Sequence, residues 1–252
     1  MKAMTRALQL LALALVCLGA YRPVLAAPAG HPAIAQQMAG VWLPDGRHSE
    51  RLPRAWPLTP AAQAAADRYQ QKYGPIDPTV DDANASCIPE SHPYGMRLIA
   101  QYPFELLFTP GRVTVFFEIY GGIRRIYLDP REVPADALPT TMGRSIGHWE
   151  GDTLVVQTTR VRKEGLGKFS GNPPVGIGRR FTERLTIGKD AEGRKQLRND
   201  ITIEDPGVLA QPVTLRMLYK WSPDIEVGEY LCQQDIWDQN VQGSPSSVPW
   251  RQ

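Results

Sequence analysis

The chain has 252 residues, with 28 lysines and arginines against 26 aspartates and glutamates and a formal net charge of +2. Hydrophobic residues make up 42% of it, which is enough to bury the core of one large domain. The near-neutral charge, without a basic run or a glycine-rich phosphate loop, gives no reason to expect nucleic acid or an anionic membrane surface as a partner.

The first 26 residues have the pattern of a secretory signal peptide. Lys2 and Arg6 form a basic start, residues 8–20 form an apolar run too short to span a bilayer, and residues 24–26 suit a cleavage site. Cleavage after Ala26 removes three basic and no acidic residues, which leaves 25 basic against 26 acidic side chains and a net charge of −1. We therefore expect a periplasmic or secreted protein with no membrane contact after cleavage.

The cysteines predict one disulfide bond. Cleavage of the signal removes Cys17 and leaves Cys87 and Cys232. Two cysteines in an oxidising compartment favour a bond between them, which would close most of the mature chain into a loop. In the chain-entropy model such a bond stabilises the fold by up to about 5 kcal/mol. Two free, buried thiols are the alternative.

Residues 27–97 form an N-terminal arm that is rich in proline, glycine and alanine. Residues 40–43 have strand character. Further on, Thr59-Pro60 is typical of a helix N-cap followed by proline at the first helical position. Strong helix formers fill residues 61–73, so a helix is predicted there. Residues 75–97 are rich in turn residues and are expected to be an ordered loop.

Residues 98–240 form a β domain in which short strand-like runs alternate with turn residues, and residues 241–252 form a polar tail. Eight or nine strands joined mainly by short turns favour an antiparallel meander. Closing the sheet removes its exposed edges. We therefore expect a mainly β fold, an antiparallel lipocalin-like barrel or a strongly curved sheet, with one N-terminal helix. The predicted strands are 99–109, 112–120, 123–129, 144–150, 153–160, 178–187, 196–204, 212–221 and 225–233.

A hairpin that turns at residues 121–122 carries the first candidate binding site. With a two-residue turn, Phe116 lies opposite Tyr127 and Glu118 lies opposite Arg125. That side combines aromatic rings with charged groups, as in a ligand pocket, whereas the other side is aliphatic and suits the core. A solvated face with a cross-strand ion pair is the alternative. The predicted ligand-binding residues of this hairpin are Phe116, Glu118, Arg125, Tyr127 and Asp129.

A second hairpin turns at Gly151-Asp152, a dipeptide that favours tight turns. Its first strand places His148 and Glu150 on one face and Trp149 on the other. An imidazole beside a carboxylate suits acid–base catalysis, with Glu118 of the first hairpin as a further acid or base. The alternative is a surface histidine beside a glutamate that caps the turn. Trp149 belongs either to the core or to the ligand site.

A third cluster centres on Glu183. Alternation along the strand turns Glu183 to the same side as Phe181 and Leu185, which is the inner side. A buried carboxylate needs a partner or becomes neutral. The arrangement predicts either a structural network or a polar anchor for a ligand, with a partner among Arg124, Arg125 and Arg216.

The sequence contains no motif typical of a metal site, a nucleotide cofactor or a serine hydrolase. The four histidines are scattered, and none pairs with a cysteine, an aspartate or another histidine at metal-ligand spacing. The chain has no Gly-x-Ser-x-Gly elbow, no dinucleotide fingerprint and no Walker loop. We therefore expect no metal and no cofactor, so that any catalysis would be acid–base chemistry.

The most specific motif is Ser145 to Val156, which reads Ser-Ile-Gly-His-Trp-Glu-Gly-Asp-Thr-Leu-Val-Val. Shorter motifs accompany it: Pro57-Leu58-Thr59-Pro60, Cys87-Ile88-Pro89, Tyr102-Pro103-Phe104-Glu105, Phe117-Glu118, Arg124-Arg125-Ile126-Tyr127, Glu183-Arg184, Ile203-Glu204-Asp205-Pro206 and Glu229-Tyr230-Leu231-Cys232. Together they resemble a family of exported, largely uncharacterised, β-rich proteobacterial proteins, over most of the mature chain. The resemblance implies export and a β-rich fold. Family members often accompany catabolic or uptake genes, which favours a small organic ligand.

The leading hypothesis is a periplasmic protein that binds a small apolar or aromatic molecule. One alternative is a cofactor-independent lyase, isomerase or cyclase that uses His148 with Glu150 or Glu118. Another is a structural or interaction domain without a pocket. The sequence does not identify the ligand, the reaction or the oligomeric state.

Overall fold

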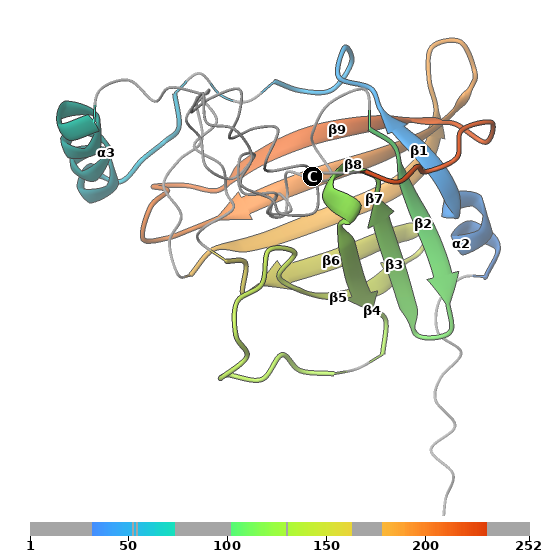
Figure 1. The fold of residues 1–252 in the computed structure, drawn as a ribbon, viewed down its shortest axis with the longest axis horizontal. Coiled ribbons are helices and arrows are strands. Elements are labelled where there is room, and N and C mark those ends of the chain that lie inside the picture. The colour runs from blue at the N-terminus through green and yellow to red at the C-terminus, as the bar shows by residue number, and fades with distance from the viewer. Residues whose placement is uncertain are drawn as a thin grey trace, which may run out of the picture.

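The structure is a computed structural model that describes residues 32–51, 53, 55–73, 102–129, 131–162 and 178–230 (Figure 1). The predicted signal peptide, the predicted loop before residue 98 and the polar tail lie outside the described residues. The same holds for Cys87 and Cys232, so the disulfide bond stays a prediction.

Within this part of the chain, nine strands close into a barrel, as the sequence predicted (Figure 1). Each strand pairs with the next along the chain, and the last pairs back with the first. All pairs are antiparallel except the fourth strand with the fifth, which are parallel, so the predicted antiparallel arrangement is wrong at this pair. The strands are β1 (Gly40–Pro44), β2 (Phe104–Thr109), β3 (Arg112–Phe117), β4 (Ile123–Tyr127), β5 (Arg144–Glu150), β6 (Thr153–Thr159), β7 (Arg180–Lys189), β8 (Lys195–Glu204) and β9 (Val213–Trp221).

Strand β1 comes from the N-terminal arm and closes the barrel. It pairs with β2 on one side and with β9 on the other. Its first residue, Gly40, has φ +107, and a Cβ there would lie 2.5 Å from the ring of Trp221. Both the backbone conformation and the close ring require glycine at the point where the chain enters the barrel.

The two α-helices of the described residues lie at opposite ends of the view in Figure 1. Helix α3 (Pro60–Tyr73) agrees with the prediction, and the Ala62 N–H donates to the Thr59 hydroxyl at 3.2 Å. Helix α2 (Pro32–Met38) was not predicted. It contacts both β2 and β7, which lie far apart in the strand order, so it spans one end of the barrel. No described helix is long and apolar enough to cross a membrane.

Alternate residues of the strands fill the lumen with apolar side chains. Phe104 packs its ring edge-on against Tyr219, with centroids 5.0 Å apart, and also contacts Phe117. At the end covered by α2, Met38 is fully buried and its carbonyl accepts a 2.8 Å hydrogen bond from the Trp42 indole. The interior of the barrel is therefore a packed core.

The predicted register of the β3–β4 hairpin is wrong, although its faces are right. Phe116 pairs with Ile123 and not with Tyr127, a displacement of four residues. The cause is a 3₁₀ turn, η1 (Ile119–Gly121), which lengthens the connection beyond the two glycines. Side chains alternate with period two, so an even displacement keeps every residue on its predicted side. The aliphatic side faces the core, and the aromatic and charged side faces outward.

The predicted ninth strand, 225–233, is also wrong in its described part, because residues 225–230 form no strand. β1 already occupies the free edge of β9, so the closed barrel offers no partner to a further strand there. The segment passes instead beside the η1 turn, where the Gly228 N–H donates to Glu118 Oε2 at 2.8 Å.

Candidate functional site

The barrel lumen contains an ion pair between Arg124 of β4 and Glu183 of β7. Both side chains are buried, with exposed fractions of 1% and 0%. Arg124 Nη1 donates to Glu183 Oε1 at 3.1 Å, and Nη2 donates to Oε2. The inward Glu183 and its arginine partner confirm the sequence-based expectation and select Arg124 among the three candidates.

Further polar groups complete this lumen network. Arg124 Nε donates to Ser145 Oγ at 3.1 Å, and its Nη2 donates to Thr158 Oγ1 at 2.9 Å. Asn199 Nδ2 donates to Glu183 Oε1 at 2.9 Å. Burial, together with the nearby negative charge of Glu183, raises the pKa of the Tyr219 hydroxyl well above its usual range. The two charges are satisfied by protein groups, so the network acts as a structural element that joins β4 to β8 across the lumen.

Two grooves flank the described barrel. The first, the barrel-end groove, has a volume of about 520 Å³ and lies between α2 and the end of β2. Its floor consists of residues that strand alternation turns inward: Leu106, Phe108, Leu128 and Trp149. The Phe108 and Trp149 rings stack with centroids 6.3 Å apart and an interplanar angle of 27°.

The local sequence explains why this groove exists. Helix α2 contributes Ala35 and Gln36, and the small residue Ala39 follows directly after the helix. Short side chains on this face leave space between the helix and β2, which lie side by side in Figure 1. On the strand, Glu105 and Leu107 alternate with the floor residues and form the outer rim. The result is an apolar recess at one end of the barrel.

The second groove, the crossover groove, results from the parallel pair β4–β5. Parallel neighbours need a long connection, and the described residues of the connection 128–143 contain no helix. Backbone hydrogen bonds anchor the connection at one end, from the Leu128 N–H to the Gly111 carbonyl (2.8 Å), and at the other, from the Thr140 N–H to the Arg160 carbonyl (3.0 Å). The groove beneath it has a volume of about 460 Å³.

Charged groups of both signs line the crossover groove. The Arg131 guanidinium lies 3.8 Å from the ring centroid of Tyr127 and forms two hydrogen bonds to the Asp129 carboxylate. These bonds from Arg131 hold the pKa of Asp129 below its usual value. Glu132, Asp136 and Arg144 complete the set of charges, so this groove favours no single sign of ligand.

No protein-family model matches this sequence, and no curated protein is significantly similar to it. The assignment of a site therefore depends on geometry. The barrel-end groove has one charged residue in its lining against four in the crossover groove, and it lies at a barrel mouth, where ligand sites are common.

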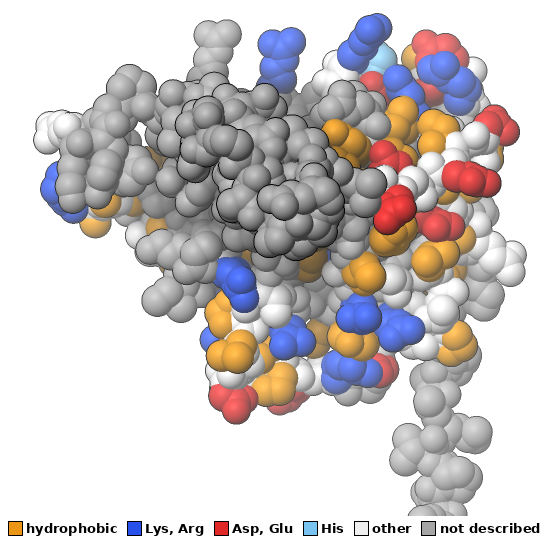
Figure 2. All heavy atoms as spheres, in the orientation of Figure 1, with side chains coloured by type: hydrophobic (Ala, Val, Ile, Leu, Met, Phe, Trp, Pro, Cys, Tyr) orange, Lys and Arg blue, Asp and Glu red, His pale blue; other side chains and the backbone are white. Residues whose placement is uncertain are grey.

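The residues predicted from the first hairpin separate in the structure. Tyr127 lines the crossover groove, and Asp129 positions the arginine above it. Phe116, Glu118 and Arg125 point outward from the barrel and line neither described groove. Figure 2 shows basic side chains gathered among apolar ones over β3 and β4. The predicted pairing of Glu118 with Arg125 is wrong, because the displaced register puts Arg125 opposite Thr114.

The predicted acid–base pair forms, but on an open surface. His148 Nε2 lies 3.2 Å from Glu150 Oε1, and Arg184 Nη1 lies 2.9 Å from Glu150 Oε2. The His148 and Glu150 side chains are 57% and 48% exposed. The hydrogen bond from Arg184, and after it the one from His148, lower the pKa of Glu150. Neither residue lines a described groove, and Glu118 binds Gly228 elsewhere.

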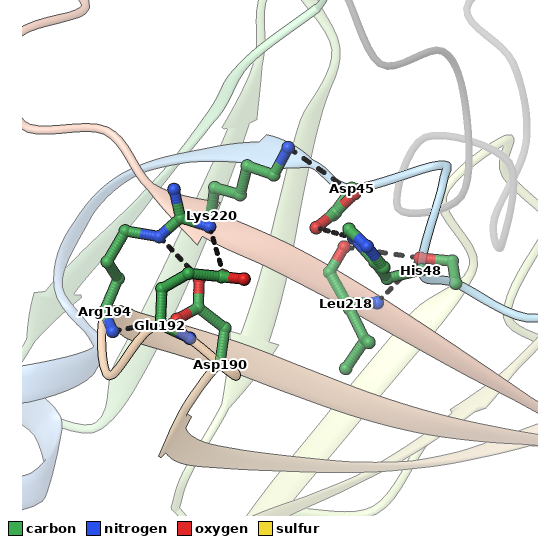
Figure 3. Close-up of polar contacts among 8 residues, drawn as sticks. Asp45, His48, Asp190, Glu192, Arg194, Leu218 and Lys220 are labelled. Atoms are coloured by element: carbon green, nitrogen blue, oxygen red, sulfur yellow. Dashed lines mark hydrogen bonds and ion pairs between the residues drawn. The ribbon is translucent and has the colours of Figure 1, made fainter.

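Sequence reasoning missed a polar cluster at the end of β1 (Figure 3). The buried Asp45 carboxylate lies 2.8 Å from His48 Nδ1 and 3.5 Å from Lys220 Nζ. The close Asp-x-x-His spacing was the available signal, but Lys220 comes from a distant strand. Among the described residues no group of three His, Cys, Asp or Glu side chains is placed to hold a metal ion.

Proposed function

We propose that the protein binds a small, largely apolar or aromatic molecule in the barrel-end groove. The observation that carries this proposal is the floor of the groove, where the stacked Phe108 and Trp149 rings lie beside Leu106 and Leu128 at a barrel mouth. Ligand pockets are typically concave, mainly apolar and about 300–1,000 Å³ in volume. At about 520 Å³, the groove falls within this range.

The closed barrel supports the proposal because it makes the groove rigid. Leu106 is fully buried, and Phe108 and Leu128 pack against the core. A ligand would therefore meet a preformed apolar surface and would order few side chains on binding.

We propose further that this binding takes place outside the cytoplasm. The basic start, the short apolar run and the cleavage site of residues 1–26 support export, as does the resemblance to exported proteins. Cell fractionation with N-terminal sequencing of the mature protein tests this. Residue 27 at the N-terminus of a periplasmic product is the expected result, whereas an intact N-terminus in the cytoplasm contradicts it.

The rival acid–base enzyme receives less support from the geometry. His148 and Glu150 are about half exposed and lie outside both described grooves, so neither described groove would hold a substrate beside them. General acid–base catalysis needs the group within hydrogen-bond reach of a held substrate.

Binding of the neutral dye Nile red, whose emission rises in apolar surroundings, tests the proposed function. In the variant Ala35→Phe a ring from α2 would enter the barrel-end groove and should abolish the dye response. The matched control Ala137→Phe places the same ring in the crossover groove and should leave the response unchanged.

The reverse pattern would move the binding site to the crossover groove. No response in the wild-type protein would favour the interaction-domain alternative. Native mass spectrometry of the protein purified from the periplasm of its own host is a second test. A small molecule that co-purifies with the protein and is lost on mild denaturation would identify the class of the natural ligand.

A further inference from the structure

Glu105 is the one residue with a charged side chain among those that line the barrel-end groove. Every other lining residue is apolar or neutral. A ligand that fills the groove would therefore meet one fixed negative charge beside an apolar wall.

Strand geometry fixes the position of Glu105. It lies between the inward Phe104 and Leu106, so its side chain points to the outer side of β2. Its cross-strand neighbours are Val41 on β1 and Phe116 on β3, and both are apolar. Glu105 as a residue is half-buried, with these two neighbours beside it in the sheet.

Glu105 has no cationic partner in the described part of the chain. Other buried carboxylates do have one: Glu183 pairs with Arg124, and Asp205 pairs with Arg179 at 3.0 Å. In Figure 2, acidic side chains lie among apolar ones over β1 and β2, whereas basic ones gather over β3 and β4.

We infer that the ligand of the barrel-end groove carries a positively charged amine next to its apolar or aromatic body. The inference deepens the proposed function and depends on it. An ammonium group would find its counter-ion in Glu105, and charge-assisted hydrogen bonds are about twice as strong as neutral ones. The aromatic floor also favours a cation, because the faces of tryptophan and phenylalanine rings attract positive charge.

The same arrangement discriminates against anionic ligands. A carboxylate in the groove would lie near Glu105, and repulsion between the two like charges would oppose its binding. The groove would therefore select amines from a pool of organic molecules of similar size and shape.

Three probes that share one body test the inference: phenylbutylamine, phenylbutanol and phenylpentanoate, which end in an ammonium, a hydroxyl and a carboxylate. Titration calorimetry of the full protein at neutral pH and low salt measures their affinities. The amine should bind about 10-fold more tightly than the alcohol, and the carboxylate should bind most weakly. Added salt should reduce the preference, because the groove is open to solvent.

The variant Glu105→Gln should reduce the affinity for the amine to the level of the alcohol. It should leave the affinity for the alcohol unchanged. Glu105→Asp, which keeps the charge, should retain part of the preference. Glu132→Gln, which removes a carboxylate from the crossover groove, should change nothing.

The possible results separate the inference from the function on which it depends. If all three probes bind equally and Ala35→Phe blocks their binding, the inference that the ligand carries an amine is wrong, and the groove remains an apolar site. An amine preference that survives Glu105→Gln would overturn the role of Glu105. No binding of any probe would overturn both the inference and the proposed function.

Discussion

Arg124 and Glu183 meet in the barrel lumen with their charged groups removed from water and two N–H···O bonds between them. They come from β4 and β7, so the pair spans the interior between strands that are not neighbours in the sheet. The parallel contact of β4 with β5 pairs only two residues on each strand, and Arg124 reinforces it through Ser145. A buried pair of this kind is sensitive to the loss of either partner.

We predict that Arg124→Met and Glu183→Met each destabilise the fold by about 3–5 kcal/mol, because each leaves an uncompensated buried charge. The double variant Arg124→Met with Glu183→Met should be markedly more stable than either single variant, since no charge remains in the lumen. Urea denaturation of the three proteins measures this. Additive losses in the double variant would show that the two residues do not stabilise each other.

A second prediction concerns Asp45 and acid. Burial raises the pKa of Asp45, but the hydrogen bond from His48 and the charge of Lys220 outweigh this and hold the pKa below its usual range. A carboxyl whose pKa is lower in the folded state contributes stability above its unfolded pKa, and that stability is lost as the pH falls through the folded value. The contribution should therefore be complete at neutral pH and decline below about pH 3.9.

The variant Asp45→Asn should thus be less stable than the wild type at neutral pH, and the difference should shrink in acid. Asp224→Asn, at an exposed carboxylate after β9, serves as the control and should not change the pH profile. Denaturation midpoints across the acid range measure both. A constant difference at every pH would mean that the Asp45 variant acts through packing alone.

Features that depend on neighbouring residues in the sequence were mostly predicted correctly, whereas most features that depend on contacts between distant segments were not. Alternation along β7 placed Glu183 in the core, because strand periodicity is local. The η1 turn was not predicted, because Tyr120 adopts φ 57, a conformation that a non-glycine residue rarely takes. Helix α2 has only seven residues, and packing on the barrel end stabilises it. The barrel-end groove joins Phe108 to Trp149, which lie on strands that no sequence pattern makes neighbours.

Closure of the barrel by β1 gives a third prediction. Gly40→Ala should strongly destabilise the protein, because the new methyl group would meet the Trp221 ring and the backbone has φ +107. Strain and overpacking of this kind each cost about 1–3 kcal/mol. Gly111→Ala is the matched control, since Gly111 has φ +70 but nothing within 4 Å of its added Cβ. Chemical denaturation should show a clearly larger loss at Gly40; equal losses would mean that the indole moves aside freely.

The stacked pair Phe108–Trp149 gives the last prediction, because it provides both contact area and a signal. A ligand in the barrel-end groove would lie against the Trp149 indole, so binding should change the tryptophan emission. Trp149→Phe should remove most of this change and keep most of the affinity, since another aromatic ring replaces the indole. Phe108→Ala should weaken the binding of phenylbutanol about 10-fold, by loss of an aromatic contact.

Trp56→Phe is the control, because Trp56 precedes α3 and lines neither described groove. It should leave both the emission change and the affinity as in the wild type. Titrations followed by fluorescence and by calorimetry measure the two quantities independently. If Trp56→Phe removes the signal and Trp149→Phe keeps it, the ligand binds away from the barrel-end groove, and the apolar floor that carries the proposed function is only part of the core.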